Sequence, residues 1–171
     1  QAHPQMAGAP KAPLANATDN AQAMVEARQT LAGKPSDPGS NWLVIGDALA
    51  RHGQFADAAG VLLGAVEKEP GNVDAWLALA NALVGHADGA ITPASLFAYQ
   101  QAERAAPEHP GPPFFLGLAM AQSGRFKEAQ GLWAGLLARS SADAPWRADL
   151  AARLALLNRL IAEQEAGAKP R

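Results

Sequence analysis

The chain has 171 residues, of which 49% are hydrophobic and 18% are charged, and its formal net charge is −2. This balance argues against phosphate-driven nucleic-acid binding, and the absence of cysteine excludes disulfides, thiolate metal sites and haem attachment through C-x-x-C-H. No apolar run approaches the roughly 18 residues that span a membrane. Because Gln1 is not an initiator methionine, we expect a processed chain or a soluble piece of a longer protein, with any membrane anchor outside this sequence.

The N-terminal part of the chain predicts a leader followed by one helix. Residues 1–17 are rich in Pro, Ala and Gly and show no period, which indicates a flexible leader. A helix is expected over 18–33, because Thr18 or Asp19 can cap its start and Gly33 can end it. This helix looks like the second half of a degenerate repeat, and we expect it to cap the end of a stack.

One pattern of aromatic and small residues then recurs along the chain. Its first copy contains Trp42, Ile45, Gly46, Leu49, Ala58, Leu62 and Pro70. Its second copy begins about 34 residues later with Trp76, Leu79, Ala80 and Leu83. A third copy contains Leu116, Gly117, Gly124, Phe126, Ala129 and Trp133. In the second copy the loop over 85–92 is lengthened, so its second helix starts late.

This order of residues is the tetratricopeptide (TPR) pattern of W-x2-L-G-x2-Y, A-x3-F and Pro. It predicts an all-α helical-hairpin solenoid with capping helices at both ends. The repeats are expected at about 39–72, 73–109 and 110–143. Their helices are expected near 41–52 and 55–68, 73–85 and 93–106, and 111–123 and 126–139. Pro112 and Pro113 replace the expected Trp, so we expect the helix that holds them to start late.

The C-terminal part of the chain predicts a closing helix that begins at Asp143 to Pro145 and lies within a cap over 144–164. Its apolar stripe has the spacing of one helix face and consists of Leu150, Leu154, Leu157 and Ile161. Residues 165–171 are expected to be a frayed tail. The TPR domain is therefore expected over 18–164.

Catalytic and metal-binding chemistry has little support in this sequence. The four histidines are His3, His52, His86 and His109, and no two are spaced i, i+4 on a helix. There is no G-x-S-x-G motif, P-loop or Rossmann fingerprint. We therefore expect no enzyme activity, no metal and no cofactor.

A stack of helical hairpins offers a concave surface lined by the first helix of each repeat. The face next to the packing register predicts a mostly apolar peptide-binding groove with a few polar anchors, formed by Leu43, Val44, Asp47, Arg51, Leu77, Asn81, Val84, Phe114, Phe115, Leu118 and Gln122. Several of the apolar ones could instead contact a neighbouring repeat, since periodicity cannot separate groove from core. Because Phe114 and Phe115 are adjacent, we expect one of them to face the groove. Packing is the expected role of the four tryptophans, Trp42, Trp76, Trp133 and Trp146.

Several segments resemble the TPR domains of c-type cytochrome biogenesis proteins of the CcmH, CcmI, CycH and NrfG type. They include Met24 to Leu31, Asn72 to Leu83, the loop that ends in Ile91-Thr92-Pro93, Gly124-Arg125-Phe126, and Asp143 to Arg147. The resemblance covers about residues 22–161. Pro113 departs from the group, which commonly has an aromatic residue there, and the group's membrane-spanning N-terminal part is absent from this sequence.

The resemblance implies a periplasmic chaperone-like module, attached to the inner membrane in the full-length protein. Such a module holds apocytochrome c, often by its C-terminal helical segment, and presents it to the haem-ligation machinery. An apolar groove suits a helix or an extended segment as its ligand. Two alternatives stay open: a generic TPR scaffold for another envelope or cytosolic complex and, as a minority reading, an enzyme with a polar cluster that the sequence does not single out.

Overall fold

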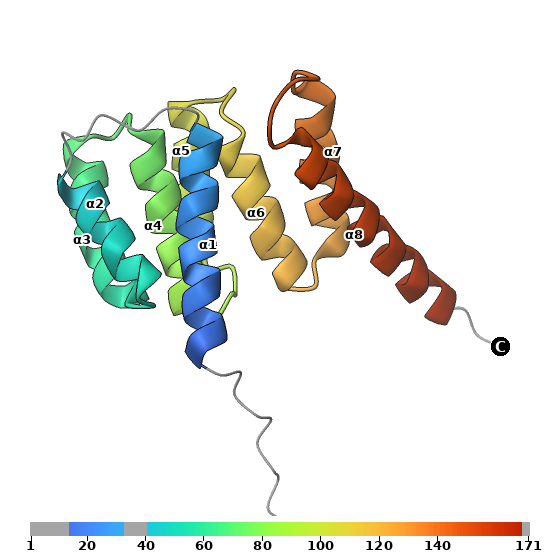
Figure 1. Ribbon diagram of the computed structural model, residues 1–171, viewed down its shortest axis with the longest axis horizontal. Helices are drawn as coiled ribbons and strands as arrows, with labels where there is room; N and C mark the ends of the chain where they lie inside the picture. The colour runs from blue at the N-terminus through green and yellow to red at the C-terminus, as the bar shows by residue number, and fades with distance from the viewer. Residues whose placement is uncertain (1–13, 33–40, 169–171) are drawn as a thin grey trace, which may run out of the picture.

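The computed structural model describes residues 14–32 and 41–168, which form eight α-helices and contain no strand (Figure 1). The helices are α1 (Leu14–Ala32), α2 (Asn41–Arg51), α3 (Phe55–Lys68), α4 (Val73–His86), α5 (Pro93–Ala105), α6 (Gly111–Gln122), α7 (Phe126–Arg139) and α8 (Arg147–Gly167). The prediction of an all-α TPR fold is confirmed. The three hairpins are α2–α3, α4–α5 and α6–α7, with α4 in the middle of the stack.

Local signals in the sequence explain where these helices turn and begin. Gly53 and Gly124 have φ of 73° and 75° in the two short hairpin turns, a conformation that glycine adopts without strain. The longer α4–α5 loop turns at Asp88 and Gly89, with φ of 53° and 88°. The helix after it begins with a capping box, in which Thr92 and Ser95 each accept a backbone N–H of the other.

Small residues set how closely the two helices of a hairpin approach. A Cβ atom added at Gly46 would lie 2.5 Å from Leu62 Cγ, so α3 can sit directly against α2 only because Gly46 has no side chain. Gly117 has the same role in the third hairpin, where an added Cβ would lie 2.3 Å from Trp133 Nε1. The Trp133 indole also donates a 3.1 Å hydrogen bond to the Phe114 carbonyl.

The expected position of the first helix is wrong. Helix α1 contacts the first helices of all three repeats, α2, α4 and α6, and runs alongside α4 in the middle of the stack, so it does not cap the end (Figure 1). The expectation that Trp42 and Ile45 are core residues is also wrong. Because α1 does not cap the stack, no described helix covers the side of α2 that carries them. Their side chains are 40% and 46% exposed. The Lys68 ammonium lies 5.0 Å from the Trp42 ring centroid.

The other three tryptophans have mixed environments. Trp133 is buried in the core, as expected. Trp76 and Trp146 are only partly buried at its edge. The Trp76 indole donates a 2.8 Å hydrogen bond to the Pro70 carbonyl, and its ring meets Phe97 edge-on at 6.1 Å.

Several helix boundaries also differ from the expectation. Helix α1 begins at Leu14, within the expected leader, because Leu and Ala are strong helix formers. Helix α6 begins at Gly111 and not late, because its prolines occupy first-turn positions whose N–H groups have no partner within the helix. Helix α8 begins at Arg147, after the expected start, and continues to Gly167 in the expected tail. Residues 1–13, 33–40 and 169–171 lie outside the described part.

The closing helix α8 packs on α7 through its predicted stripe. Leu150, Leu157 and Ile161 are buried and Leu154 is partly buried. Arg147 joins the start of α8 to the end of α7, because its guanidinium donates a 2.6 Å hydrogen bond to the Leu137 carbonyl. Figure 1 shows that the C-terminal part of α8 extends beyond α7.

We predict that Gly46→Ala lowers the free energy of unfolding by about 1–3 kcal/mol, because the new methyl group meets a fully buried leucine. Gly60→Ala in α3 is the matched control, since nothing lies within 4 Å of its added Cβ. It should raise the free energy of unfolding by about 0.5–1 kcal/mol. Urea unfolding measures both, and a Gly46→Ala chain as stable as the control would contradict this packing.

We predict that Leu150→Ala lowers the free energy of unfolding by about 2–5 kcal/mol, because Leu150 is fully buried between α8 and the stack. Leu156→Ala in the same helix should change it by less than about 0.5 kcal/mol, because that side chain is 54% exposed. Equal effects of the two substitutions in urea unfolding would show that α8 does not dock through this stripe.

Candidate functional site

The candidate site is the surface of α2, α4 and α6 that contacts α1, which we call the inner face. Each of these helices is the first of its repeat, so the inner face corresponds to the surface on which the sequence predicts a groove. In this structure α1 lies on it. The inner face therefore already holds a helix that belongs to the same chain.

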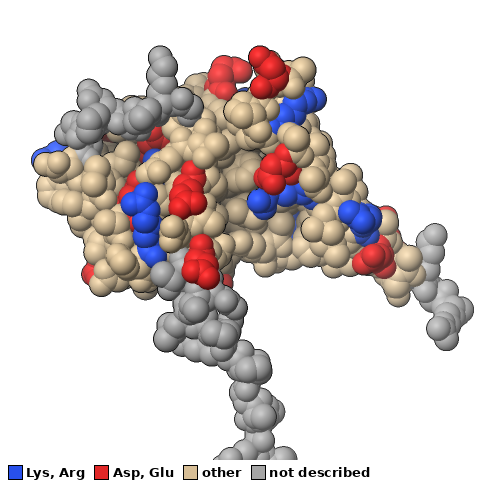
Figure 2. Space-filling view, viewed as in Figure 1, with Lys and Arg blue, Asp and Glu red and all other residues tan. Residues whose placement is uncertain are grey.

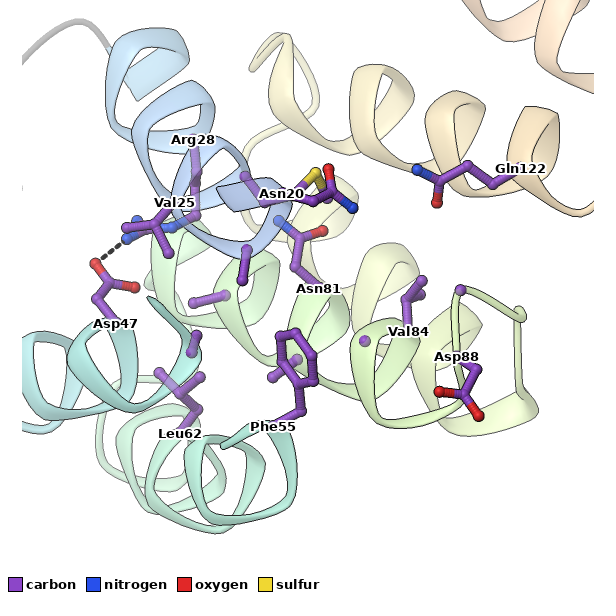
Figure 3. A pocket seen from close by; sticks show the side chains of 17 residues that line it. Asn20, Val25, Arg28, Asp47, Phe55, Leu62, Asn81, Val84, Asp88 and Gln122 are labelled. Carbon is purple, nitrogen blue, oxygen red and sulfur yellow. Dashed lines mark hydrogen bonds and ion pairs between the residues drawn. The ribbon is translucent and has the colours of Figure 1, made fainter. Parts of the chain in front are cut away.

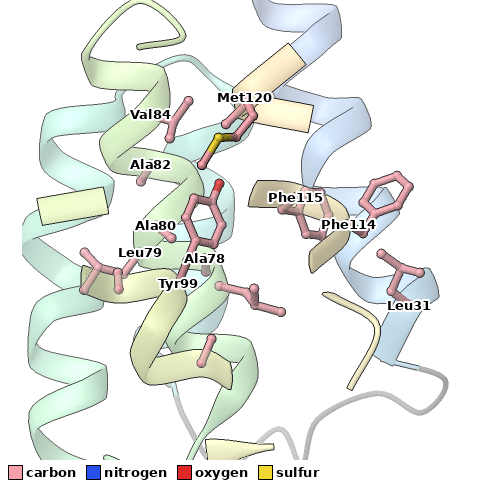
Figure 4. Close-up of a cluster of buried hydrophobic side chains, with 14 of the residues drawn as sticks. Leu31, Ala78, Leu79, Ala80, Ala82, Val84, Tyr99, Phe114, Phe115 and Met120 are labelled. Carbon is pink, nitrogen blue, oxygen red and sulfur yellow. The ribbon is translucent and has the colours of Figure 1, made fainter. Parts of the chain in front are cut away.

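One side of α1 is buried against the inner face. Ala21, Val25, Arg28 and Leu31 are the buried residues of its described side chains, and they are spaced i, i+4, i+7 and i+10. This spacing places them on one helix face. Leu31 belongs to the main hydrophobic core cluster and lies near Phe114 of α6 (Figure 4).

Arg28 is the one charged residue in this buried stripe, and it is only 3% exposed. Its guanidinium forms an ion pair and a hydrogen bond with the Asp47 carboxylate on α2 (Figure 3). Arg28 Nη1 also lies 3.5 Å from Asp74 Oδ1, in the first turn of α4. A single cation thus joins α1 to two repeats. Such an ion pair is costly to break from one side, because the partner charge stays buried.

Burial raises the pKa of Asp47, and the Arg28 guanidinium opposes this by favouring the charged carboxylate. Gln29 also donates a 3.4 Å hydrogen bond to Asp47. The pKa of the nearby His109 is lowered by burial, against the attraction of Asp74. Two carboxylates of the inner face, Asp47 and Asp74, thus lie beside the Arg28 guanidinium, whose charge opposes their mutual repulsion.

A cavity of about 440 Å³ lies between the middle of α1, from Asn20 to Arg28, and the inner face. Figure 3 shows Phe55 and Leu62 of α3 at its base, Asn81 and Val84 of α4 along it, and Gln122 of α6 at the far side. The lining also includes Asn20, Met24, Asp88 and Gly89. The cavity combines an apolar base with amide and carboxylate groups around it, which suits a side chain or peptide more than a small charged ligand.

The structure brings four of the predicted groove residues together around this cavity: Asp47, Asn81, Val84 and Gln122. Asn81 also accepts a 2.8 Å hydrogen bond from the Tyr99 hydroxyl, which orients its amide. Other predicted residues lie elsewhere. Leu43 and Leu77 belong to the core, Leu118 is partly buried against it, Arg51 is partly exposed at the end of α2, and Val44 is exposed.

Phe114 and Phe115 are both buried, so neither is exposed to an open groove while α1 lies on the inner face, and the expectation that one of them faces the groove stays a prediction. Helix α6 is contacted by α1, α4, α5 and α7, so two adjacent residues can each find a packed neighbour on different sides. Their rings meet edge-on with centroids 5.1 Å apart. The Arg153 guanidinium of α8 lies 5.9 Å from the Phe114 ring centroid.

Sequence reasoning missed Arg28 and Asp74 as parts of the site. Asp74 lies in the first turn of α4, where the helix dipole alone accounts for a negative charge. Arg28 itself could have indicated the site, because helical spacing places this charged residue on the same face as the apolar residues Val25 and Leu31. Such a position is expected to be paired when buried.

The described residues offer little for other chemistries. They contain no group of three or more His, Cys, Asp or Glu side chains arranged to hold a metal ion. No described helix is long and apolar enough to span a bilayer. Figure 2 shows acidic and basic side chains interspersed on the face in view, over a mostly uncharged surface.

Comparison with known proteins supports the repeat assignment and gives it a context. The tetratricopeptide repeat family matches residues 40–82. The protein "Cytochrome c-type biogenesis protein CycH" of Bradyrhizobium diazoefficiens is 32% identical over 124 residues, which cover 72% of this chain and 33% of that protein. The protein of the same name from Rhizobium meliloti is 32% identical over 157 residues, which cover 88% of this chain and 38% of that protein.

A solved structure shares the fold. The type III secretion translocator chaperone SycD of Yersinia enterocolitica has a TM-score of 0.58 and 15% identity, over 71% of this chain and 83% of that chain. This likeness supports the helical-repeat fold alone. The chain spans about a third of the length of the curated relatives it matches. The match to the tetratricopeptide repeat family and the two relatives together support a TPR domain of the c-type cytochrome biogenesis proteins.

Proposed function

We propose that this domain is a protein-binding module of cytochrome c maturation that holds apocytochrome c, by its C-terminal helical segment, on the inner face. The observation that carries the proposal is the position of α1, which contacts α2, α4 and α6. A surface that accepts one amphipathic helix across three repeats has the shape and polarity to accept another.

The context of the relatives supports the identity of the client. Proteins named for c-type cytochrome biogenesis share this repeat region, and that process works on the periplasmic side of the inner membrane. We therefore place the domain in the periplasm, attached to the inner membrane through a part of the full-length protein outside this sequence. There it would present its client to the haem-ligation machinery without catalysing a reaction itself.

The proposal makes haem status decisive for binding. An apocytochrome is incompletely folded, so its helical segment is free to dock. After haem attachment the same segment packs within the folded cytochrome and is no longer available. A general scaffold for another envelope or cytosolic complex would not distinguish the two forms.

We predict that apocytochrome c binds at the cavity beside Gln122, with a dissociation constant in the micromolar range or tighter, as expected for a specific but reversible contact. The chain has no cysteine, so Gln122→Cys carries a single fluorophore at an exposed position that lines the cavity. Gln100→Cys in α5 is the matched control, because Gln100 is also exposed but does not line the cavity. Titration with apocytochrome should change the fluorescence at Gln122→Cys only.

Holocytochrome c and a scrambled C-terminal peptide serve as negative ligands in the same titration. Binding of the apo form alone supports a chaperone in haem ligation. Equal responses to the apo and holo forms would point to a scaffold that ignores haem status. A response only from the label at Gln100→Cys would contradict the inner face as the binding surface.

A further inference from the structure

Helix α1 occupies the inner face in the manner of a ligand. The helices α2 to α7 form the three hairpins, whereas α1 belongs to none of them and contacts the first helix of each. Its buried face is short and regular, with Ala21, Val25, Arg28 and Leu31 in sequence. These side chains show which residue types the inner face accepts at successive positions.

The middle of α1 is loosely packed. Its buried residues Ala21 and Val25 are small, and both line the cavity of about 440 Å³. Side chains that line a void lack the dispersion contacts of a close-packed interior. Within the hairpins, by contrast, Gly46 and Gly117 leave no room for a Cβ atom, which would lie 2.5 Å or less from the facing side chain. Detachment of α1 would leave these contacts within the hairpins in place.

The acidic groups of the inner face stay in place when α1 leaves. Asp47 belongs to α2 and Asp74 to α4, whereas their shared cation, Arg28, belongs to α1. A helix that covered Asp47 without supplying a positive charge would bury this carboxylate without its ion-pair partner, a strongly unfavourable state. A competing helix avoids this cost only if it carries its own cation at the same place.

We infer that the inner face binds helices that carry Lys or Arg in the place of Arg28, and that such a helix displaces α1. The inference rests on the proposed function, because it takes the inner face as the binding surface. The preferred partner segment has a small residue, an aliphatic residue, a cation and a large aliphatic residue spaced i, i+4, i+7 and i+10. Its cation enters between Asp47 and Asp74, and α1 blocks the face until then.

The first test uses a fluorescein-labelled peptide with the sequence of residues 14–32, added to the full chain carrying Arg28→Gln, whose own α1 has lost its cation. This chain should bind the native peptide at least about tenfold more tightly than the peptide carrying Arg28→Gln, as measured by fluorescence anisotropy. A peptide carrying Glu26→Gln is the matched control, because Glu26 is exposed, and it should bind like the native peptide.

The double variant Arg28→Gln/Asp47→Asn tests the acidic partner. Without the Asp47 charge, the preference for the arginine peptide should fall to less than about threefold. Circular dichroism and thermal unfolding check that the repeats of each variant remain folded. Equal affinity of the Arg28→Gln chain for the arginine and glutamine peptides, or no binding of either peptide to a folded chain, would overturn the inference.

The second test measures displacement. On the Gln122→Cys background, Arg28→Gln should tighten the binding of apocytochrome c at least about tenfold, because less binding energy is spent on releasing α1. Unchanged affinity would overturn the displacement of α1 while leaving the proposed function intact. If apocytochrome bound none of the variants while the peptide preferences were as expected, the proposed client would be rejected. The inference that the inner face selects helices with a cation at the Arg28 position would stand.

Discussion

Close approach between the paired helices is the constraint on which the rest of this structure depends. At Gly46 and Gly117 the first helix of a repeat presents no side chain, and Leu62 or Trp133 of the second helix fills that space. Side-chain size at these positions sets the distance between the helices of a hairpin. In α4 the equivalent position holds Ala80, which is fully buried. The free sides of α2, α4 and α6 form one continuous surface. The position of the inner face therefore depends on the contacts between the first and second helices of the repeats, on the opposite side of α2, α4 and α6.

The contact between α1 and the inner face has a different physical character. It depends on few apolar side chains and on one buried cation, Arg28, shared by carboxylates from two repeats. Buried ion pairs contribute little net stability but strongly disfavour a wrong or missing partner. A contact of this kind contributes more to the specificity of binding than to its affinity. Together with the cavity beside α1, this favours an exchangeable helix at a surface that stays rigid.

Much of the fold could be predicted because its signals are local or periodic. The capping box at Thr92, the turn glycines Gly53 and Gly124, and the apolar stripe of α8 each act within a few residues of sequence. The candidate site was only partly predictable. Asp47, Asn81, Val84 and Gln122 were identified from helix periodicity, but period alone assigned Phe114 or Phe115 to the groove although both are buried. Both side chains are buried because four helices contact α6. A repeat pattern in the sequence does not show how many helices surround a given helix.

The amino-acid sequence by itself determined the helical hairpins, their number and their order, because repeated glycines, aromatics and caps specify them residue by residue. Only the tertiary structure decided where α1 lies. A helix with one apolar face can pack equally well at the end of a stack or across it, and its sequence does not distinguish the two. The choice depends on what the surface offers in three dimensions. Here Asp47 and Asp74, from separate repeats, converge on Arg28 and draw the helix onto the inner face.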